Sequence, residues 1–319
     1  MRKKKAVLIV GCGNIGLRHL QSICFADYPP ESISIFDPMV INKSRLEEIF
    51  VQHTGLKLPE SLNIHVCNTQ FGVANPNIII FSSTSDIRDK FLVEYLDRYQ
   101  NSIFLLEKPI YSLADKYNST DLVYSNVYVN YSRRMWPFYQ KLRDRGLHGK
   151  QKFSLTVSGR QWGAGTNAFH FIDLFSYLTG IVGPQINGYA NKIFPSKRTG
   201  FMDFTGSFLS KIDGHTLTLE NESSQNNDSK YEIDIKLGET TYKIDENNQK
   251  IIKISDGSIE TLPIEIPFQS ALTSKFLADI ETNSVELTPF NDALKNEISL
   301  FEFLNKNFED KLENGVRLS

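Results

Sequence analysis

The sequence predicts an α/β protein that begins with a doubly wound parallel sheet. Three observations carry this prediction. An apolar run, Ala6–Val10, leads directly into a glycine-rich turn, as expected for a parallel strand that is buried on both faces. Strand and helix patterns then alternate as far as residue 106. Finally, the second of these strands ends at an acidic residue, Asp37.

The glycine-rich turn has the spacing G-x-G-x-x-G, with Gly11, Gly13 and Gly16 at the three glycine positions. In dinucleotide-binding domains the first glycine permits a tight turn and the second lets the backbone approach a pyrophosphate. The third lets the next helix pack on the strand. The amides at the start of that helix, at Asn14 and Ile15, would face the phosphates. We therefore expect this turn to bind a dinucleotide.

The acidic residue Asp37 lies 21 residues after Gly16. A carboxylate there can accept hydrogen bonds from the adenosine ribose hydroxyls and would repel a 2′-phosphate. The sequence thus predicts NAD rather than NADP. In the alternative interpretation the glycines form only a structural turn and Asp37 is a solvated acid. The order of strand, turn, helix and acid favours the cofactor.

Composition limits the class of protein. The 319 residues suffice for two domains of about 150 residues each. A net charge of -2 gives no indication of nucleic acid or an anionic membrane as a partner, and no apolar stretch approaches the ~18 residues of a membrane span. The three cysteines, Cys12, Cys24 and Cys67, lack metal-site spacing. We expect a cytoplasmic protein without a metal.

The first half continues the alternation of strands and helices. We predict a helix over residues 42–52, strands over 64–67, 77–82 and 103–106, and a helix from residue 85 to about 99. Ser83 and Thr84 follow one strand, and Glu107, Lys108 and Pro109 follow the next. Since ligands bind at the carboxyl edge of an open parallel sheet, we expect these five residues to line the cofactor.

The second half is richer in strands. We predict strands over residues 127–131, 153–158, 192–194, 206–212, 216–220, 231–237, 241–244 and 251–254, with helices over 168–178, 269–282 and 291–306. The polar stretch 221–229 is expected to be a hairpin loop. The expected domains are therefore 1–125, with the parallel sheet, and 126–319, an α+β domain with a large, open, mixed or antiparallel sheet.

Four motifs in this order resemble the Gfo/Idh/MocA family of NAD(P)-dependent sugar oxidoreductases. They are GCGNIGLRHL at 11–20, EKP at 107–109, RMWP at 134–137 and H-x-x-D at 170–173. The resemblance implies a Rossmann domain, hydride transfer at a sugar carbon and a homodimer or homotetramer formed through the second sheet.

Lys108 and His170 are the candidate acid–base residues. A lysine beside a cationic nicotinamide can have its pKa lowered toward neutrality, and the resemblance implies that Lys108 contacts the reacting hydroxyl. An imidazole exchanges protons near neutral pH, although His170 can also be interpreted as a core residue. Asp173 shares its helical face and is predicted to orient the ring or to bind a substrate hydroxyl.

The resemblance also implies the substrate pocket. Arg134, Arg160 and Trp162 would wall it, since guanidinium groups bind carboxylates and phosphates and tryptophan offers a face to a sugar ring. An anionic sugar would follow, such as a nucleotide sugar or a nonulosonic acid of surface-polysaccharide biosynthesis. Each arginine can instead belong to an ion pair. Many family members have an aspartate where this chain has Thr166, followed by Asn167, which can bind a sugar hydroxyl.

Two alternative functions stay open. A dinucleotide-binding sensor or scaffold with the same fold would lack chemistry, and Thr166 in place of an acid motivates this hypothesis. A reductase of a non-sugar carbonyl would keep the cofactor and differ only in its substrate.

Overall fold

The computed structural model describes residues 5–118, 124–223, 230–308 and 315–319. The chain forms two compact units. Unit 1 comprises residues 1–110, 123–132 and 267–290, and unit 2 comprises 111–122, 133–266 and 291–319. This division differs from the expected boundary after residue 125, because the chain returns to unit 1 over residues 267–290. Across the described residues, no helix has the length and apolar character needed to span a membrane.

Unit 1 contains a seven-stranded sheet in the order β15-β6-β5-β4-β1-β2-β3. Its strands are β1 (Ala6–Val10), β2 (Ser32–Phe36), β3 (Asn63–Val66), β4 (Ile78–Phe81), β5 (Ile103–Leu106), β6 (Val127–Val129) and β15 (Thr288–Pro289). Strands β1 to β6 are parallel, and β15 is antiparallel to β6. The central strands are continuous apolar runs because helices cover both of their faces. The predicted doubly wound sheet is confirmed, with the strand order reversing between β1 and β4.

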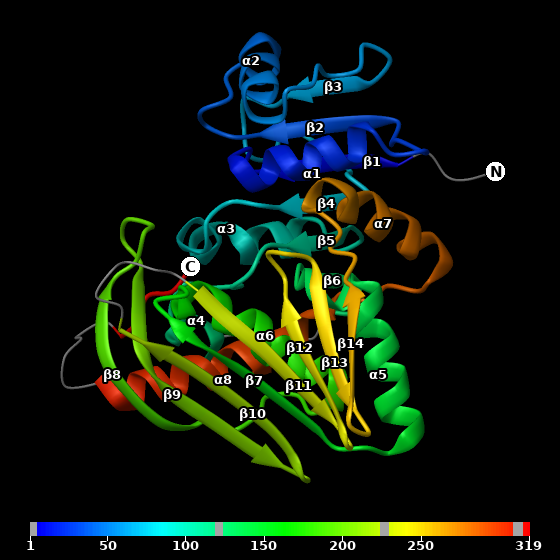
Figure 1. Ribbon diagram of the computed structural model, residues 1–319. Helices are drawn as coiled ribbons and strands as arrows, with labels where there is room; N and C mark the ends of the chain where they lie inside the picture. The colour runs from blue at the N-terminus through cyan, green and yellow to red at the C-terminus, as the bar shows by residue number, and fades with distance from the viewer. Residues whose placement is uncertain (1–4, 119–123, 224–229, 309–314) are drawn as a thin grey trace. The chain divides into compact units, whose positions relative to one another are not determined.

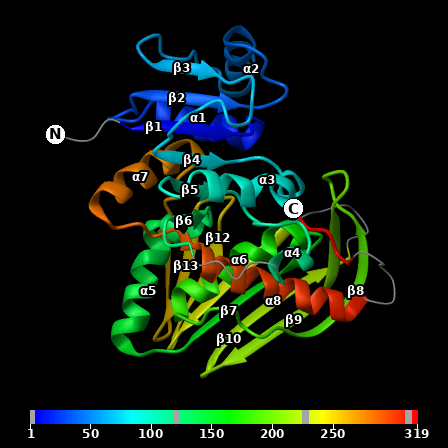
Figure 2. The same ribbon diagram turned by 180° about the vertical axis from the view of Figure 1, so that it is seen from behind.

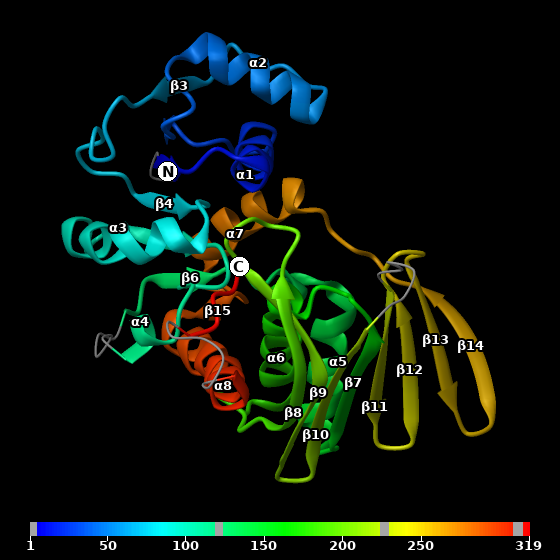
Figure 3. The ribbon, with the colours of Figure 1, turned by 90° about the vertical axis from the view of Figure 1, so that its left-hand side faces the viewer.

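The helices of unit 1 lie on both faces of this sheet. They are α1 (Asn14–Cys24), α2 (Lys43–Thr54), α3 (Ser85–Arg98) and α7 (Gln269–Thr282). Figure 3 shows α3 on one side, and α1 and α2 on the other. Helix α7 packs against α1, and the Ser274 amide donates to the Ser22 hydroxyl at 2.9 Å. A helix from late in the chain thus completes the first unit.

Unit 2 contains an eight-stranded mixed sheet in the order β14-β13-β12-β11-β7-β10-β9-β8. Its strands are β7 (Phe153–Arg160), β8 (Asn187–Pro195), β9 (Met202–Ile212), β10 (His215–Glu222), β11 (Lys230–Leu237), β12 (Thr240–Asp245), β13 (Lys250–Ser255) and β14 (Ser258–Pro263). Only the pair of β7 and β10 is parallel among the described pairs. The predicted mixed sheet is confirmed, and β14 was missed.

Helices cover one face of this second sheet. They are α5 (Pro137–Gly149), α6 (Ala164–Thr179) and α8 (Phe290–Phe308), with the short α4 (Asp115–Asn118) and the 3-10 turn η1 (Ser132–Met135). Figures 1 and 2, seen from opposite sides, show α5, α6 and α8 behind the sheet in one view and in front of it in the other. Helix α5 was not predicted, because Gly146 lowers its helix propensity. A Cβ at Gly146 would lie 2.2 Å from the Phe153 ring, so packing requires the glycine.

The predicted hairpin over residues 221–229 is wrong. The strands that flank it, β10 and β11, pair with opposite edges of β7 and not with each other. Residues 224–229 themselves lie outside the described residues. Local polarity does not show whether two successive strands pair with each other, because pairing depends on residues distant in the sequence.

Candidate functional site

The glycine loop between β1 and α1 is shaped by close backbone packing. A Cβ at Gly11, where φ is +90°, would lie 2.6 Å from the Ser83 amide nitrogen, and one at Gly16 would lie 2.1 Å from the Gly11 carbonyl oxygen. Gly13 differs, since a Cβ there meets nothing within 4 Å. Gly11 and Gly16 are therefore required by packing, whereas Gly13 leaves space beside the loop.

Helix α1 begins beside that space, and its N-terminus carries no side-chain cap. The first amides of a helix have no partner within the helix. Asn14 and Ile15 are exposed at this end, so their amides can donate to a ligand. An uncapped helix N-terminus next to an open glycine is the arrangement that binds a pyrophosphate.

Asp37 is joined to the glycine loop, although 25 residues separate it from Cys12. Its Oδ2 accepts a hydrogen bond from the Cys12 amide at 2.6 Å, and its Oδ1 accepts one from the Met39 amide at 2.8 Å. Each carboxylate oxygen can accept a further bond. Burial, together with the Asp37 charge, raises the pKa of the Cys12 thiol to about 12. This thiol is therefore a small packing residue at neutral pH.

The loop after β4 is attached to the same place. The Ser82 hydroxyl donates to the Gly11 carbonyl at 2.6 Å, and Ser83 packs against Gly11. Thr84 is the N-cap residue of α3. The structure thus brings most of the predicted cofactor residues together at the carboxyl ends of β1, β2 and β4.

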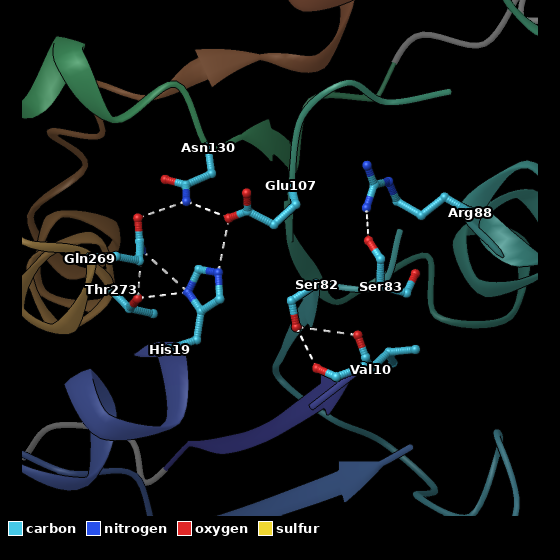
Figure 4. Close-up of polar contacts among 10 residues, drawn as sticks. Val10, His19, Ser82, Ser83, Arg88, Glu107, Asn130, Gln269 and Thr273 are labelled. Atoms are coloured by element: carbon cyan, nitrogen blue, oxygen red, sulfur yellow. Dashed lines mark hydrogen bonds and ion pairs between the residues drawn. The ribbon is translucent and has the colours of Figure 1, made fainter. Parts of the chain in front are cut away.

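A buried polar cluster, which the sequence analysis missed, holds Glu107 at the end of β5. Figure 4 shows that its members come from α1, α7 and the end of β6. His19, which is fully buried, contacts Glu107 through Nε2 at 3.0 Å and Thr273 through Nδ1 at 2.8 Å. The Asn130 amide donates to Glu107 at 2.5 Å and to Gln269 at 3.0 Å. The sequence places His19 on the first helix, but its partners Glu107 and Thr273 lie 88 and 254 residues away along the chain.

The cluster determines the charge state of Glu107. Burial raises the pKa of Glu107, but the hydrogen bond and charge of His19, with the Asn130 amide and the Arg88 charge, outweigh burial and hold the pKa below its usual value. The carboxylate is therefore ionised at neutral pH. Glu107 was expected to line the cofactor, whereas the described hydrogen bonds of its side chain go to His19 on α1 and to Asn130, which follows β6.

Lys108 follows Glu107 and is half-buried. The Lys108–Pro109 peptide bond is cis. On the far side of this bond, the guanidinium of Arg88 donates to the Pro109 carbonyl and, at 3.1 Å, to the Ile110 carbonyl. It also donates to the Ser83 carbonyl. Arg88 was not predicted from the sequence, because nothing in the helical pattern of α3 distinguishes a buried arginine from a solvated one.

In unit 2, His170 lies on α6 and is half-buried. Helix α6 ends at Thr179, and Gly180 caps it in the left-handed conformation at φ +77°. Asp173, at 1% exposure, accepts two hydrogen bonds from Arg134, at 2.7 Å each. This bidentate pair differs from the roles expected of both residues. Asp173 is held by Arg134, and Arg134 is neutralised inside the unit.

The other predicted substrate residues are dispersed over unit 2. Arg160 is exposed and lies 3.7 Å from Glu222 in a surface ion pair. The Trp162 ring is 2% exposed, packs against Phe171 and Tyr231 and donates to a backbone carbonyl through Nε1. The ring is therefore packed mainly in the core, although Trp162 also belongs to the lining of the cavity at the start of α6.

Arg133, which lies beside Arg134, is also committed to the interior of unit 2. It donates to both carboxylate oxygens of Glu246, at 2.8 and 2.6 Å. Tyr139 and Tyr231 donate to the same carboxylate. The neighbouring arginines 133 and 134 thus stabilise the fold instead of forming an open anion site.

A cavity of about 440 Å³ at the start of α6 brings together other candidates. Its lining includes Thr166 and Asn167, and the Asn167 amide donates to the Trp162 carbonyl at 2.8 Å. Two exposed cations that the sequence analysis missed, Lys197 and Arg198, lie on the connection between β8 and β9 and also line it. The described residues contain no group of three or more potential metal ligands.

Comparison with known proteins agrees with this architecture. No family model matches the chain, and no curated protein sequence matches it. Solved structures do. The WlbA dehydrogenase of Bordetella pertussis, in complex with NADH and UDP-GlcNAcA, is similar at a TM-score of 0.66 and 15% identity over 99% of this chain and 100% of that one. A putative NADPH-dependent oxidoreductase of Desulfitobacterium hafniense gives 0.68 and 13% identity over 98% and 97%.

A third solved structure carries the name of the family. A Gfo/Idh/MocA family oxidoreductase of Vibrio cholerae is similar at a TM-score of 0.64 and 11% identity, over 96% of this chain and 97% of that one. These similarities extend over nearly the entire chain, including both units. The chain therefore has the fold of the Gfo/Idh/MocA oxidoreductases.

Proposed function

We propose that this chain is an NAD(H)-dependent oxidoreductase that transfers a hydride at a secondary alcohol or ketone of a sugar. The observation that carries the proposal is the glycine loop, where Gly13 leaves open space beside the uncapped N-terminus of α1 and Asp37 is joined to the loop. An adenine dinucleotide needs amides for its pyrophosphate and an acceptor for its ribose. The residues present fit that cofactor.

The protein contributes binding, orientation and proton transfer. Bound NAD(H) would supply or accept the hydride. The amides of Asn14 and Ile15 bind the pyrophosphate, and Asp37 accepts hydrogen bonds from the ribose. Lys108 would contact the reacting hydroxyl and share the acid–base role with His170. His170 exchanges a proton with that oxygen, since an imidazole titrates near neutral pH.

Cofactor preference follows from the Asp37 charge. We expect the chain to bind NADH at least about tenfold more tightly than NADPH, because a carboxylate repels a 2′-phosphate. Asp37→Asn keeps an acceptor for the Cys12 amide but removes the charge, so the preference should shrink. Nicotinamide fluorescence measures both affinities, with the exposed Asp27→Asn as the matched control. Equal affinities in the unaltered protein would contradict the assignment of Asp37.

The acid–base roles are tested by turnover. We expect Lys108→Met and His170→Asn each to reduce NADH consumption by about two orders of magnitude, the usual contribution of a general acid or base. The substrates to screen are UDP-sugars and acidic sugars in their keto forms. Lys90→Met, an exposed lysine on α3, is the control. Unchanged turnover in His170→Asn would remove this histidine from the mechanism.

An anionic sugar is the substrate class that we favour. Lys197 and Arg198 line the cavity beside Asn167, where they can attract a phosphate or carboxylate. The solved structure that contains UDP-GlcNAcA has the same fold and supports this choice. A non-sugar carbonyl substrate is the alternative, and the same screen distinguishes the two. Among the described residues, the helices of unit 2 cover one face of its sheet (Figures 1 and 2), and the opposite face supports assembly into a dimer or tetramer, which light scattering would test.

A catalytically silent sensor is the second candidate function. It is favoured by the composition of α6, where Thr166 replaces an acid and Asp173 is held by Arg134. Mixing the NADH-bound protein with keto-sugars in a single turnover separates the two functions. An enzyme oxidises the bound NADH and its absorbance falls, whereas a sensor binds without any loss of absorbance.

A further inference from the structure

Arg88 connects two loops of unit 1 that are far apart in the sequence. It lies on α3 and is 1% exposed. Its Nη1 donates to the Ser83 carbonyl in the loop after β4. Its Nη2 and Nε donate to the Pro109 and Ile110 carbonyls in the loop after β5. Figure 4 shows Arg88 reaching Ser83 on the opposite side of the β5 strand end from His19.

A guanidinium is suited to this task. Its planar group carries five donors in a fixed geometry, so one side chain can bind carbonyls of two loops at once. A lysine has a single nitrogen and cannot span them in the same way. Placing a cation in the interior is costly, and these contacts supply the hydrogen bonds that offset the cost.

Both loops belong to the candidate site. Ser83 packs against Gly11 of the cofactor loop. Lys108 lies between Glu107, which His19 and Asn130 hold, and Pro109, which Arg88 holds. The backbone on each side of Lys108 is thus fixed. Arg88, which holds Pro109, also binds Ser83, and Ser83 packs against the glycine loop.

We propose that Arg88 is a positioning residue that couples the loop after β4, at Ser83, to the backbone that carries Lys108. The proposal rests on the proposed function, because it assigns Arg88 the alignment of Lys108 with bound NAD(H). Arg88 acts through these two loops and does not itself touch the reacting atoms.

Hydrogen exchange of the protein without cofactor tests the coupling directly. In Arg88→Met we expect faster amide exchange in the segments 82–84 and 107–111 together, since both lose a shared donor, while β1 and β2 exchange as before. Arg98→Met is the matched control, because Arg98 lies at the exposed end of the same helix and contacts Phe71. Faster exchange in one segment only, in neither, or throughout unit 1 would overturn the proposal.

Binding and kinetics test the consequence. We expect the NADH dissociation constant of Arg88→Met to rise about tenfold, because binding must then order both loops. Hydride transfer should slow by about a hundredfold through misplacement of Lys108. Arg88→Lys keeps the positive charge but loses the planar guanidinium with its five donors. It should show the slower hydride transfer with a smaller change in NADH affinity. A folded Arg88→Lys with unaltered hydride transfer would show that charge alone matters and would overturn the coupling.

The two proposals fail in different ways. If the unaltered protein binds no NADH, the proposed function and the alignment role of Arg88 are both wrong, while the paired exchange result still decides whether Arg88 couples the loops. If NADH binds and is oxidised normally by a folded Arg88→Met, only the proposal on Arg88 is wrong. If Arg88→Met does not fold, exchange and kinetics of Arg88→Lys decide by the same criteria.

Discussion

Gly16→Ala is expected to weaken NADH binding strongly and to destabilise the protein by about 3 kcal/mol, the upper range for overpacking a close contact. The added Cβ would lie 2.1 Å from the Gly11 carbonyl oxygen. That neighbour is backbone and cannot rotate away, so α1 must move from β1. We expect NADH affinity to fall by about a hundredfold, measured by nicotinamide fluorescence, and the free energy of unfolding to fall in urea titrations.

Gly13→Ala is the matched control for this substitution. A Cβ at Gly13 meets nothing within 4 Å, so its stability should change by less than about 1 kcal/mol, the ordinary difference between glycine and alanine. NADH affinity should nevertheless fall, because the new methyl group occupies the space that we assign to the pyrophosphate. Normal NADH binding by Gly13→Ala would contradict the location of the cofactor.

Glu107→Leu is expected to destabilise the protein by about 3 kcal/mol, because removing one partner of a buried pair leaves the others unsatisfied. His19 and Asn130 would both lose their contact with the carboxylate. The free energy of unfolding measures this loss. Glu94→Leu, at an exposed position on α3, is the control and should change stability little. A loss no larger than that of the control would show that the cluster does not stabilise unit 1.

The same carboxylate predicts a dependence on pH. The pKa of folded Glu107 lies below its usual value, so the stabilisation is present above the pKa of the unfolded chain. It is lost as the pH falls through the lower folded pKa. Glu107→Gln removes this titration, and its stability should therefore decline less between about pH 5 and pH 3 than that of the unaltered protein.

Much of unit 1 was predictable from local sequence. The apolar runs of β1 and β5 were assigned with the observed bounds, because buried parallel strands between turn residues have a simple pattern. The glycine spacing and Asp37 indicated a loop that the structure forms. In unit 2, α5 was missed. Its Gly146 allows close packing against the Phe153 ring, and helix propensity along the chain does not reveal this contact.

Side-chain partners were less predictable than side-chain types. His170 and Asp173 share a helical face by spacing alone, yet Asp173 is held by Arg134, 39 residues away. Trp162 belongs to the core for a similar reason, since rings from α6 and β11 pack against it. The sequence does not show which side chains surround a residue near a predicted pocket, because those neighbours depend on how distant strands pair.

The sequence by itself determined which candidate cofactor residues occur in unit 1 and their order along the chain. A glycine turn comes first, then an acid, then the Glu107–Lys108–Pro109 motif. These depend on spacing along the chain, and the regular repeat of strand and helix places them at one sheet edge. Only the tertiary structure decided that α7 completes unit 1, that His19 holds Glu107 and that Arg88 joins two loops. Such contacts connect distant residues whose approach depends on how the whole unit packs.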